Sequence, residues 1–67
     1  MMLTVNGEQK QFQPSPRTVA DLLELLTVPG RRTAVEQNGL IVDPNSFTTA
    51  GLQENDKLEI VTFVGGG

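Results

Sequence analysis

One amphipathic helix, placed after a single hairpin, constrains the fold of this 67-residue chain more than any other feature. In the segment "RTVADLLELLTVPG", residues 17–30, the apolar positions recur at helical spacing; they are Val19, Leu22, Leu23 and Leu26. Thr18 can cap the start, with Asp21 as a partial capping box, and Pro29-Gly30 is expected to end the helix. A chain of this length forms one small domain, so the leucine face must pack against strands.

Two hairpin patterns flank the helix, and each contains an Asn-Gly pair of the kind that favours a type I′ turn. The first strand, "MLTVNG", turns at Asn6-Gly7 into a weaker return strand over residues 8–13. The second hairpin, "TAVEQNGLIVD", turns at Asn38-Gly39. A last strand is expected over residues 58–63, after the polar turn "ENDK".

The expected order is therefore strand, strand, helix, strand, strand, strand. A single helix can bury its apolar face only by lying across one face of a mixed sheet, which gives a two-layer α+β domain of about five strands. We expect the first and last strands to be neighbours near the centre of the sheet. This arrangement is the β-grasp, or ubiquitin-like, fold. We assign it to residues 1–63 and expect residues 64–67 to form a flexible C-terminal glycine tail.

Composition limits the chemistry of the domain. The formal net charge is −3 and the only basic pair is Arg31-Arg32, which argues against a nucleic-acid partner. Cysteine and histidine are absent, so the chain lacks a thiolate and the side chain best suited to proton transfer near neutral pH. No apolar run approaches the roughly 20 residues that span a bilayer. We expect a cytoplasmic protein that is not an enzyme, binds no metal or cofactor itself, and contacts neither nucleic acid nor membrane.

Two clusters of charged residues could have a binding function or could simply be solvated surface. Glu54, Asp56 and Glu59 could be metal ligands, but their spacing does not match a calcium loop, so a solvated turn is favoured. Arg31 and Arg32 could contact an acidic partner, although a basic pair of this kind is more typical of a solvated loop.

The last strand presents two different faces. If Leu58 and Ile60 face the helix, Val61 and Phe63 must lie on the open side of the sheet. Apolar residues on an open face are candidates for partner contact, so Val61 and Phe63 are predicted partner-binding residues. The alternative is local packing under the loop that contains Phe47.

The three terminal glycines raise the main chemical question. Glycine has no Cβ, so an extended run of it can pass through a channel too narrow for side chains, and four extended residues span roughly 13–14 Å. The carboxylate of Gly67 could therefore enter the active site of another protein while the domain docks outside. An ionised carboxylate is a poor acyl electrophile and would need activation, for example as an acyl-adenylate. The alternative is a frayed terminus.

The whole chain resembles the ThiS family of sulfur carrier proteins. The resemblance rests on "MLTVNGE", on "TVADLLELL" in the helix, on "AVEQNGLIV" in the second hairpin and, most specifically, on the end, "LQENDKLEIVTFVGGG". It implies that Gly67 is the functional residue, adenylated by an E1-like enzyme of the ThiF type with ATP and magnesium and then converted to a thiocarboxylate. Gly66 matches the second glycine of the family's terminal pair, the part of the tail that lies extended in partner sites, and Gly65 is an extra glycine that many members carry; both are predicted partner-binding residues.

The resemblance also implies the partners and the destination of the sulfur. A donor such as a cysteine desulfurase would supply the sulfur, and thiazole synthase of the ThiG type would receive it to build the thiazole of thiamine. Three alternatives stay open on the sequence. They are a carrier of another pathway, such as the small subunit of molybdopterin synthase, a ubiquitin-like modifier of lysines, and an interaction domain with an inert tail.

Overall fold

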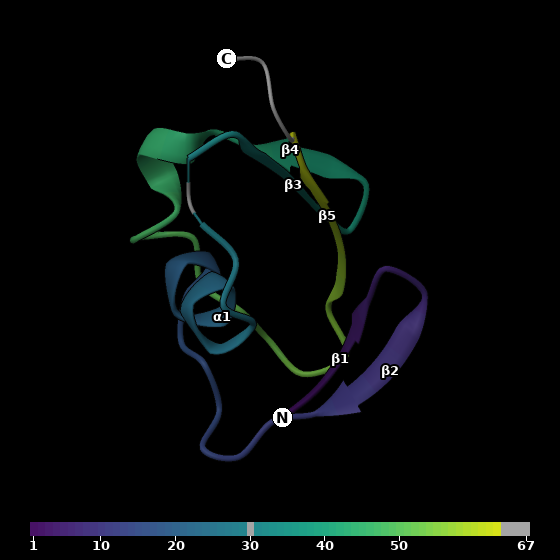
Figure 1. Ribbon diagram of the computed structural model, residues 1–67. Helices are drawn as coiled ribbons and strands as arrows, with labels where there is room; N and C mark the ends of the chain where they lie inside the picture. The colour runs from purple at the N-terminus through teal and green to yellow at the C-terminus, as the bar shows by residue number, and fades with distance from the viewer. Residues whose placement is uncertain (30, 64–67) are drawn as a thin grey trace.

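The structure is a computed structural model that describes residues 1–29 and 31–63. Its elements follow the predicted order (Figure 1). They are β1 (Met2–Val5), β2 (Glu8–Gln11), α1 (Val19–Leu25), β3 (Thr33–Gln37), β4 (Leu40–Val42), a short 3₁₀ helix (Pro44–Ser46) and β5 (Lys57–Thr62). The expected return strand over 8–13 ends two residues early, and the last strand begins one residue earlier and ends one residue earlier than expected.

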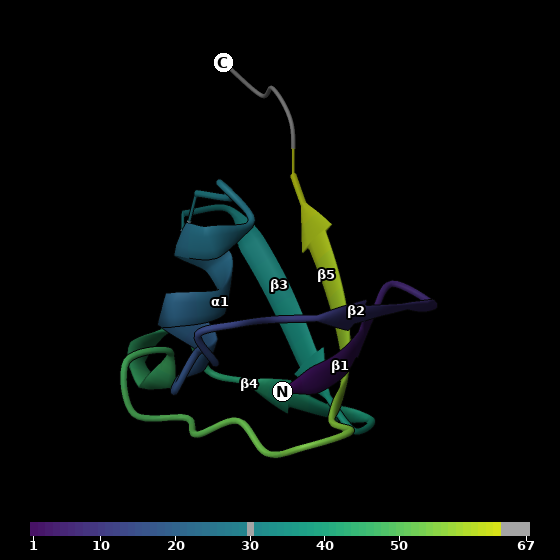
Figure 2. The ribbon, with the colours of Figure 1, turned by 90° about the horizontal axis from the view of Figure 1, so that it is seen from below.

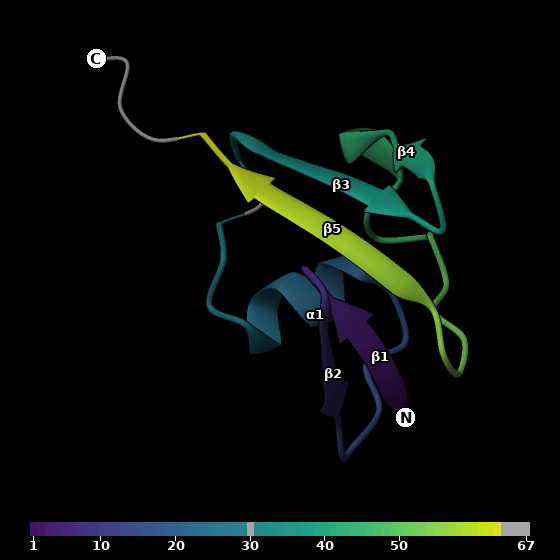
Figure 3. The same ribbon diagram turned by 90° about the vertical axis from the view of Figure 1, so that its right-hand side faces the viewer.

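The strands form one mixed five-stranded sheet in the order β2-β1-β5-β3-β4. The first and last strands run parallel to each other, with Val5 opposite Leu58, whereas the other neighbours are antiparallel. Figure 3 shows β5 crossing the sheet between β1 and β3, and Figure 2 shows α1 beside that sheet. The predicted β-grasp arrangement, with the first and last strands as neighbours, is confirmed.

Both hairpins close through the predicted Asn-Gly turns. Asn6 and Gly7 have φ values of 49° and 84°, and Asn38 and Gly39 have 52° and 86°. Two successive residues with positive φ define the type I′ geometry, whose twist matches that of paired strands. Asn and Gly are the residues that tolerate this conformation best, and the sequence therefore fixes both turns locally.

The helix begins as predicted and ends earlier. The Thr18 hydroxyl accepts a hydrogen bond from the Asp21 N–H at 3.2 Å, which is an N-cap. The expectation that Pro29-Gly30 ends the helix is wrong, because Thr27 takes a left-handed φ of 58° directly after the C-cap Leu26. The Thr27 N–H then bonds the Glu24 carbonyl at 3.0 Å and the Val28 N–H bonds the Leu23 carbonyl at 2.8 Å. These two bonds form a Schellman motif, which satisfies carbonyls at the helix end.

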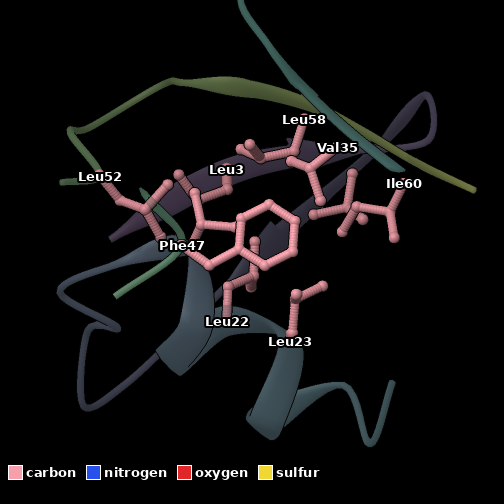
Figure 4. Packing of buried hydrophobic residues seen from close by; sticks show 10 residues of the cluster. Leu3, Leu22, Leu23, Val35, Phe47, Leu52, Leu58 and Ile60 are labelled. Atoms are coloured by element: carbon pink, nitrogen blue, oxygen red, sulfur yellow. The ribbon is translucent and has the colours of Figure 1, made fainter. Parts of the chain in front are cut away.

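The hydrophobic core lies between α1 and one face of the sheet (Figure 4). Leu22 and Leu23 project from the helix toward side chains from β1, β3 and β5. The buried members are Leu3, Val5, Val19, Leu22, Leu23, Val35, Phe47, Leu52, Leu58 and Ile60. The helix and strand periodicities converge on this cluster. Within residues 1–29 and 31–63, no α-helix covers the opposite face of the sheet (Figure 2).

Candidate partner interface

The candidate site is the end of β5 and the sheet face around it. Val61 and Ala34 are paired across β5 and β3, and beyond them the Phe63 N–H donates to the Arg32 carbonyl at 2.7 Å. The chain is therefore held to β3 up to its last described residue. The predicted tail, 64–67, lies outside the described residues, and with it the predicted site residues Gly65, Gly66 and Gly67.

The other edge of β5 is held by the first hairpin. The Asn6 N–H donates to the Leu58 carbonyl at 2.9 Å. The Asn6 side chain continues this pairing, because its Oδ1 accepts from the Ile60 N–H at 2.7 Å and its Nδ2 donates to the Ile60 carbonyl at 3.1 Å. The strand that precedes the predicted tail is thus fixed on both edges.

The side chains of β5 alternate as the sequence predicts. Leu58 and Ile60 are buried in the core, whereas Val61 and Phe63 are 54% and 58% exposed. Packing beneath the Phe47 loop is excluded for Val61, because Phe47 lies in the core on the helix side and Val61 lines the open face. The predicted exposure of Val61 and Phe63 is confirmed, while the role of these two residues in partner contact stays a prediction.

The open face carries an ordered arrangement of side chains across three strands. In one row Ile41 of β4 is opposite Glu36 of β3, which is opposite Glu59 of β5. In the next row Ala34 is opposite Val61. These five residues line a shallow surface hollow of about 90 Å³, and Ile41 is 80% exposed. The open face near the end of β5 therefore combines apolar side chains with two carboxylates.

The three carboxylates considered as metal ligands have three separate positions. Glu54 accepts a hydrogen bond from the Met2 N–H at 2.8 Å, Glu59 lies on the open sheet face, and Asp56 is only 8% exposed. Within residues 1–29 and 31–63, no group of three or more acidic residues could hold a metal ion. The favoured interpretation, a solvated turn, is wrong for Asp56.

Asp56 joins the loop before β5 to the second hairpin. Its carboxylate accepts hydrogen bonds from the Asn38 side chain at 2.9 Å, from the Gln37 side chain at 2.9 Å and from the Gln53 N–H at 2.8 Å. Burial alone raises the pKa of this carboxyl, but the hydrogen bonds from Asn38, Gln53 and Gln37 outweigh it and lower the pKa below its ordinary value. Asp56 is a structural anchor that places the start of β5.

The basic pair lies in the connection between the helix and β3. Arg31 and Arg32 are exposed, and Arg32 also supplies the carbonyl that holds Phe63. The exposure agrees with the solvated-loop interpretation. None of the described helices is long and apolar enough to cross a membrane.

Comparison with known proteins relates this chain to one protein family. The sequence model of the ThiS family matches residues 3–67, a range that includes β5 and the three terminal glycines. The chain belongs to the ThiS family. The resemblance expected from the sequence is therefore confirmed.

Individual ThiS-like proteins agree with this assignment. The sulfur carrier protein ThiS of Bacillus subtilis is 33% identical over 66 residues, which covers 98% of this chain and 100% of that protein. The crystal structure of a ThiS thiamine biosynthesis protein from Geobacter metallireducens superposes with a TM-score of 0.84 at 32% identity and 100% coverage of both chains. These relatives support a sulfur-carrier role in thiamine biosynthesis.

A third relative is much longer. A thiazole synthase of Paramagnetospirillum magneticum is 46% identical over all 67 residues, but this chain spans only 20% of that protein's length. A ThiS-like segment therefore also occurs within a protein named for thiazole synthesis.

Proposed function

We propose that this chain is the sulfur carrier for the thiazole of thiamine and that it acts through a thiocarboxylate on Gly67. The observation that carries the proposal is the family match over residues 3–67, because it includes Gly65, Gly66 and Gly67 along with the folded domain. The chain is a co-substrate in this scheme, and the catalysis belongs to its partners.

The chemistry follows from the weakness of a carboxylate as an electrophile. In an E1-like adenylating enzyme of the ThiF type, which uses ATP and Mg²⁺, the Gly67 carboxylate attacks the α-phosphate of ATP and releases pyrophosphate. A cysteine desulfurase is a suitable sulfur donor, and it supplies the sulfur as a persulfide. Attack of the terminal persulfide sulfur on the acyl carbon releases AMP and forms an acyl disulfide. A second thiol then reduces this acyl disulfide, which leaves the thiocarboxylate on Gly67 and a new disulfide between the donor thiol and the reducing thiol. The absence of cysteine in the chain agrees with a sulfur atom that comes from outside.

The thiocarboxylate keeps a reactive sulfide covalently bound and still nucleophilic. We propose thiazole synthase of the ThiG type as its recipient. The similarity of this chain to a segment of the Paramagnetospirillum magneticum thiazole synthase supports that choice over the molybdopterin destination. Linking a sulfur carrier to the enzyme that consumes its sulfur raises the effective concentration of the carrier at that enzyme, so a ThiS-like segment within a thiazole synthase fits a carrier that serves thiazole synthesis.

The experiment is an intact-mass measurement after incubation with ATP, Mg²⁺, a ThiF-type enzyme and a sulfur donor. We expect the mass to change by the replacement of one oxygen with one sulfur, and deletion of Gly67 should abolish the change. An unchanged mass, under conditions that convert the Bacillus subtilis carrier, would overturn the proposal. Growth of a deletion strain on thiazole separates the thiamine destination from molybdenum cofactor synthesis, and conjugates on lysines in extract would indicate a modifier.

A further inference from the structure

Two carboxylates lie directly opposite each other in the middle of the open sheet face. Glu36 and Glu59 are cross-strand partners on β3 and β5, which are neighbouring strands in the sheet. Glu36 and Glu59 occupy a hydrogen-bonded position of the ladder between the two strands. The ladder's hydrogen bonds show this on either side of the pair: the Asn38 N–H donates to the Lys57 carbonyl, and the Phe63 N–H donates to the Arg32 carbonyl. Such opposite side chains have Cβ atoms about 4.5–5.5 Å apart, so both carboxylates lie within the span of one guanidinium group.

This placement costs stability in the isolated domain. Like charges directly opposite on a sheet destabilise it, and the formal net charge of −3 adds to the repulsion. Lys57 occupies the same face of β5, two residues earlier, but among the described residues no ion pair joins it to Glu36 or Glu59. In the described part of the chain, neither glutamate is therefore paired with a cation.

The surroundings of the pair are those of an interface. Ile41 extends the row of Glu36 and Glu59 on one side, and Val61 lies in the adjacent row, both strongly exposed. Phe63 continues the same strand face toward the end of the described chain and is 58% exposed. Charged residues are depleted at the centres of protein interfaces, so a carboxylate pair at the centre of an apolar face requires an opposite charge from the partner.

We propose that Glu36 and Glu59 together bind an Arg or Lys side chain of a partner protein, with Ile41 and Val61 packed against apolar residues that flank this cation. The occupant follows from charge complementarity. The proposal rests on the proposed function only in identifying this partner with thiazole synthase, which must hold the domain while it receives the sulfur.

The same pair argues against a second copy of this chain as the occupant. A symmetric dimer through this face would bring four carboxylates together around the dimer axis, without a basic side chain in the lined hollow to neutralise them. The two glutamates therefore disfavour a dimer through the apolar residues around them by charge repulsion. The same two charges favour a cationic partner by attraction.

The test compares charge-neutral variants in binding to a ThiG-type thiazole synthase. The double variant Glu36→Gln and Glu59→Gln keeps the shape of the face and removes both charges. The matched control, Glu8→Gln and Glu24→Gln, makes the same change in net charge at exposed positions on β2 and α1. Affinity is measured by calorimetry in the absence of ATP, at low and at physiological salt, together with the melting temperature of each variant.

We expect the open-face double variant to bind at least about 10-fold more weakly at low salt, with a smaller salt dependence, whereas the control changes by about 2-fold or less. Its melting temperature should equal or exceed that of the wild type, which excludes unfolding as the cause. Equal affinity of the two double variants would overturn the proposal, as would a wild type that does not bind. A wild type that binds through these glutamates but is never converted to a thiocarboxylate would overturn the proposed function alone.

Discussion

The side chain of Asn6 hydrogen-bonds both backbone polar groups of Ile60, a residue 54 positions away in the sequence. The last backbone hydrogen bond between the first hairpin and β5 joins the Asn6 N–H to the Leu58 carbonyl at 2.9 Å. The carboxamide of Asn6 extends that pairing by imitating one more residue of a strand. The turn that closes the first hairpin therefore also fixes the strand that leads toward the predicted tail.

Replacing Asn6 by glycine isolates the contribution of this side chain. Glycine accepts the φ of 49° without strain, so the change removes the two hydrogen bonds and leaves the backbone conformation favourable. We expect a loss of about 1–2 kcal/mol in the free energy of unfolding, measured by urea denaturation. Asn55→Gly is the matched control, because Asn55 has a φ of 69° and its side chain makes no hydrogen bond that the described structure shows. A loss at Asn55 as large as that at Asn6 would contradict this account.

Asp56 should make the stability of the domain depend on pH. Its pKa is lowered in the folded state, so the unfolded chain binds more protons and stability increases with pH across this range. The stabilisation is fully present above the unfolded pKa of about 3.9 and is lost as the pH falls through the folded value. Urea denaturation between pH 7 and pH 3 measures this slope.

Asp56→Asn should lower the stability at pH 7 by about 1–3 kcal/mol, because the donors of Gln37, Asn38 and Gln53 lose a charged, buried acceptor. The variant should also reduce the pH slope. Glu24→Gln, on the exposed side of α1, serves as the control and should keep both the stability and the slope. An Asp56→Asn variant that keeps the full slope would show that other carboxyls cause it.

Thr27 offers a site where the fold can be stabilised. A β-branched residue with a φ of 58° is strained, and glycine is the residue that helices most often place at this position of a Schellman motif. We expect Thr27→Gly to raise the free energy of unfolding by about 0.5–2 kcal/mol. Thr48→Gly, at an exposed position with negative φ, should be neutral or destabilising. A stability gain at Thr48 equal to that at Thr27 would remove the explanation by backbone strain.

Gly66→Val tests the proposed passage of the tail through a narrow channel. A β-branched side chain adds width to the chain at the residue before Gly67, so thiocarboxylate formation should slow by at least about 10-fold, without a change in melting temperature. The measurement is the rate of the mass change in the conversion assay. Gly51→Ala is the control, because a Cβ at Gly51 meets only the Arg17 carbonyl oxygen at 3.9 Å, and its conversion rate should match the wild type. Equal rates for all three proteins would contradict threading.

The sequence predicts this fold where the determinants are local. Asn6-Gly7 and Asn38-Gly39 specify their turns within two residues, and the spacing of Leu22 and Leu23 places the helix on the core. The helix end was not predictable, since Thr27 takes its left-handed conformation because of the two bonds of the motif rather than an intrinsic preference.

The candidate site shows the same division between local and distant determinants. Exposure of Val61 and Phe63 follows from strand alternation alone, and it is confirmed. The burial of Asp56 depends on donors from a hairpin 18 and 19 residues earlier, so its sequence neighbours suggest a solvated turn instead. The pairing of Glu36 with Glu59 depends on the register between β3 and β5, which no local pattern specifies.

The central position of β5 has a mechanical consequence. A pull along this strand, such as a partner would exert in drawing the end of the chain into a narrow site, is resisted at both edges simultaneously, by β1 and Asn6 on one side and by β3 on the other. The backbone hydrogen bonds of an antiparallel pair lie across the direction of such a pull, so they must shear together instead of opening one after another. The domain is therefore expected to stay folded while a partner pulls on its C-terminal end.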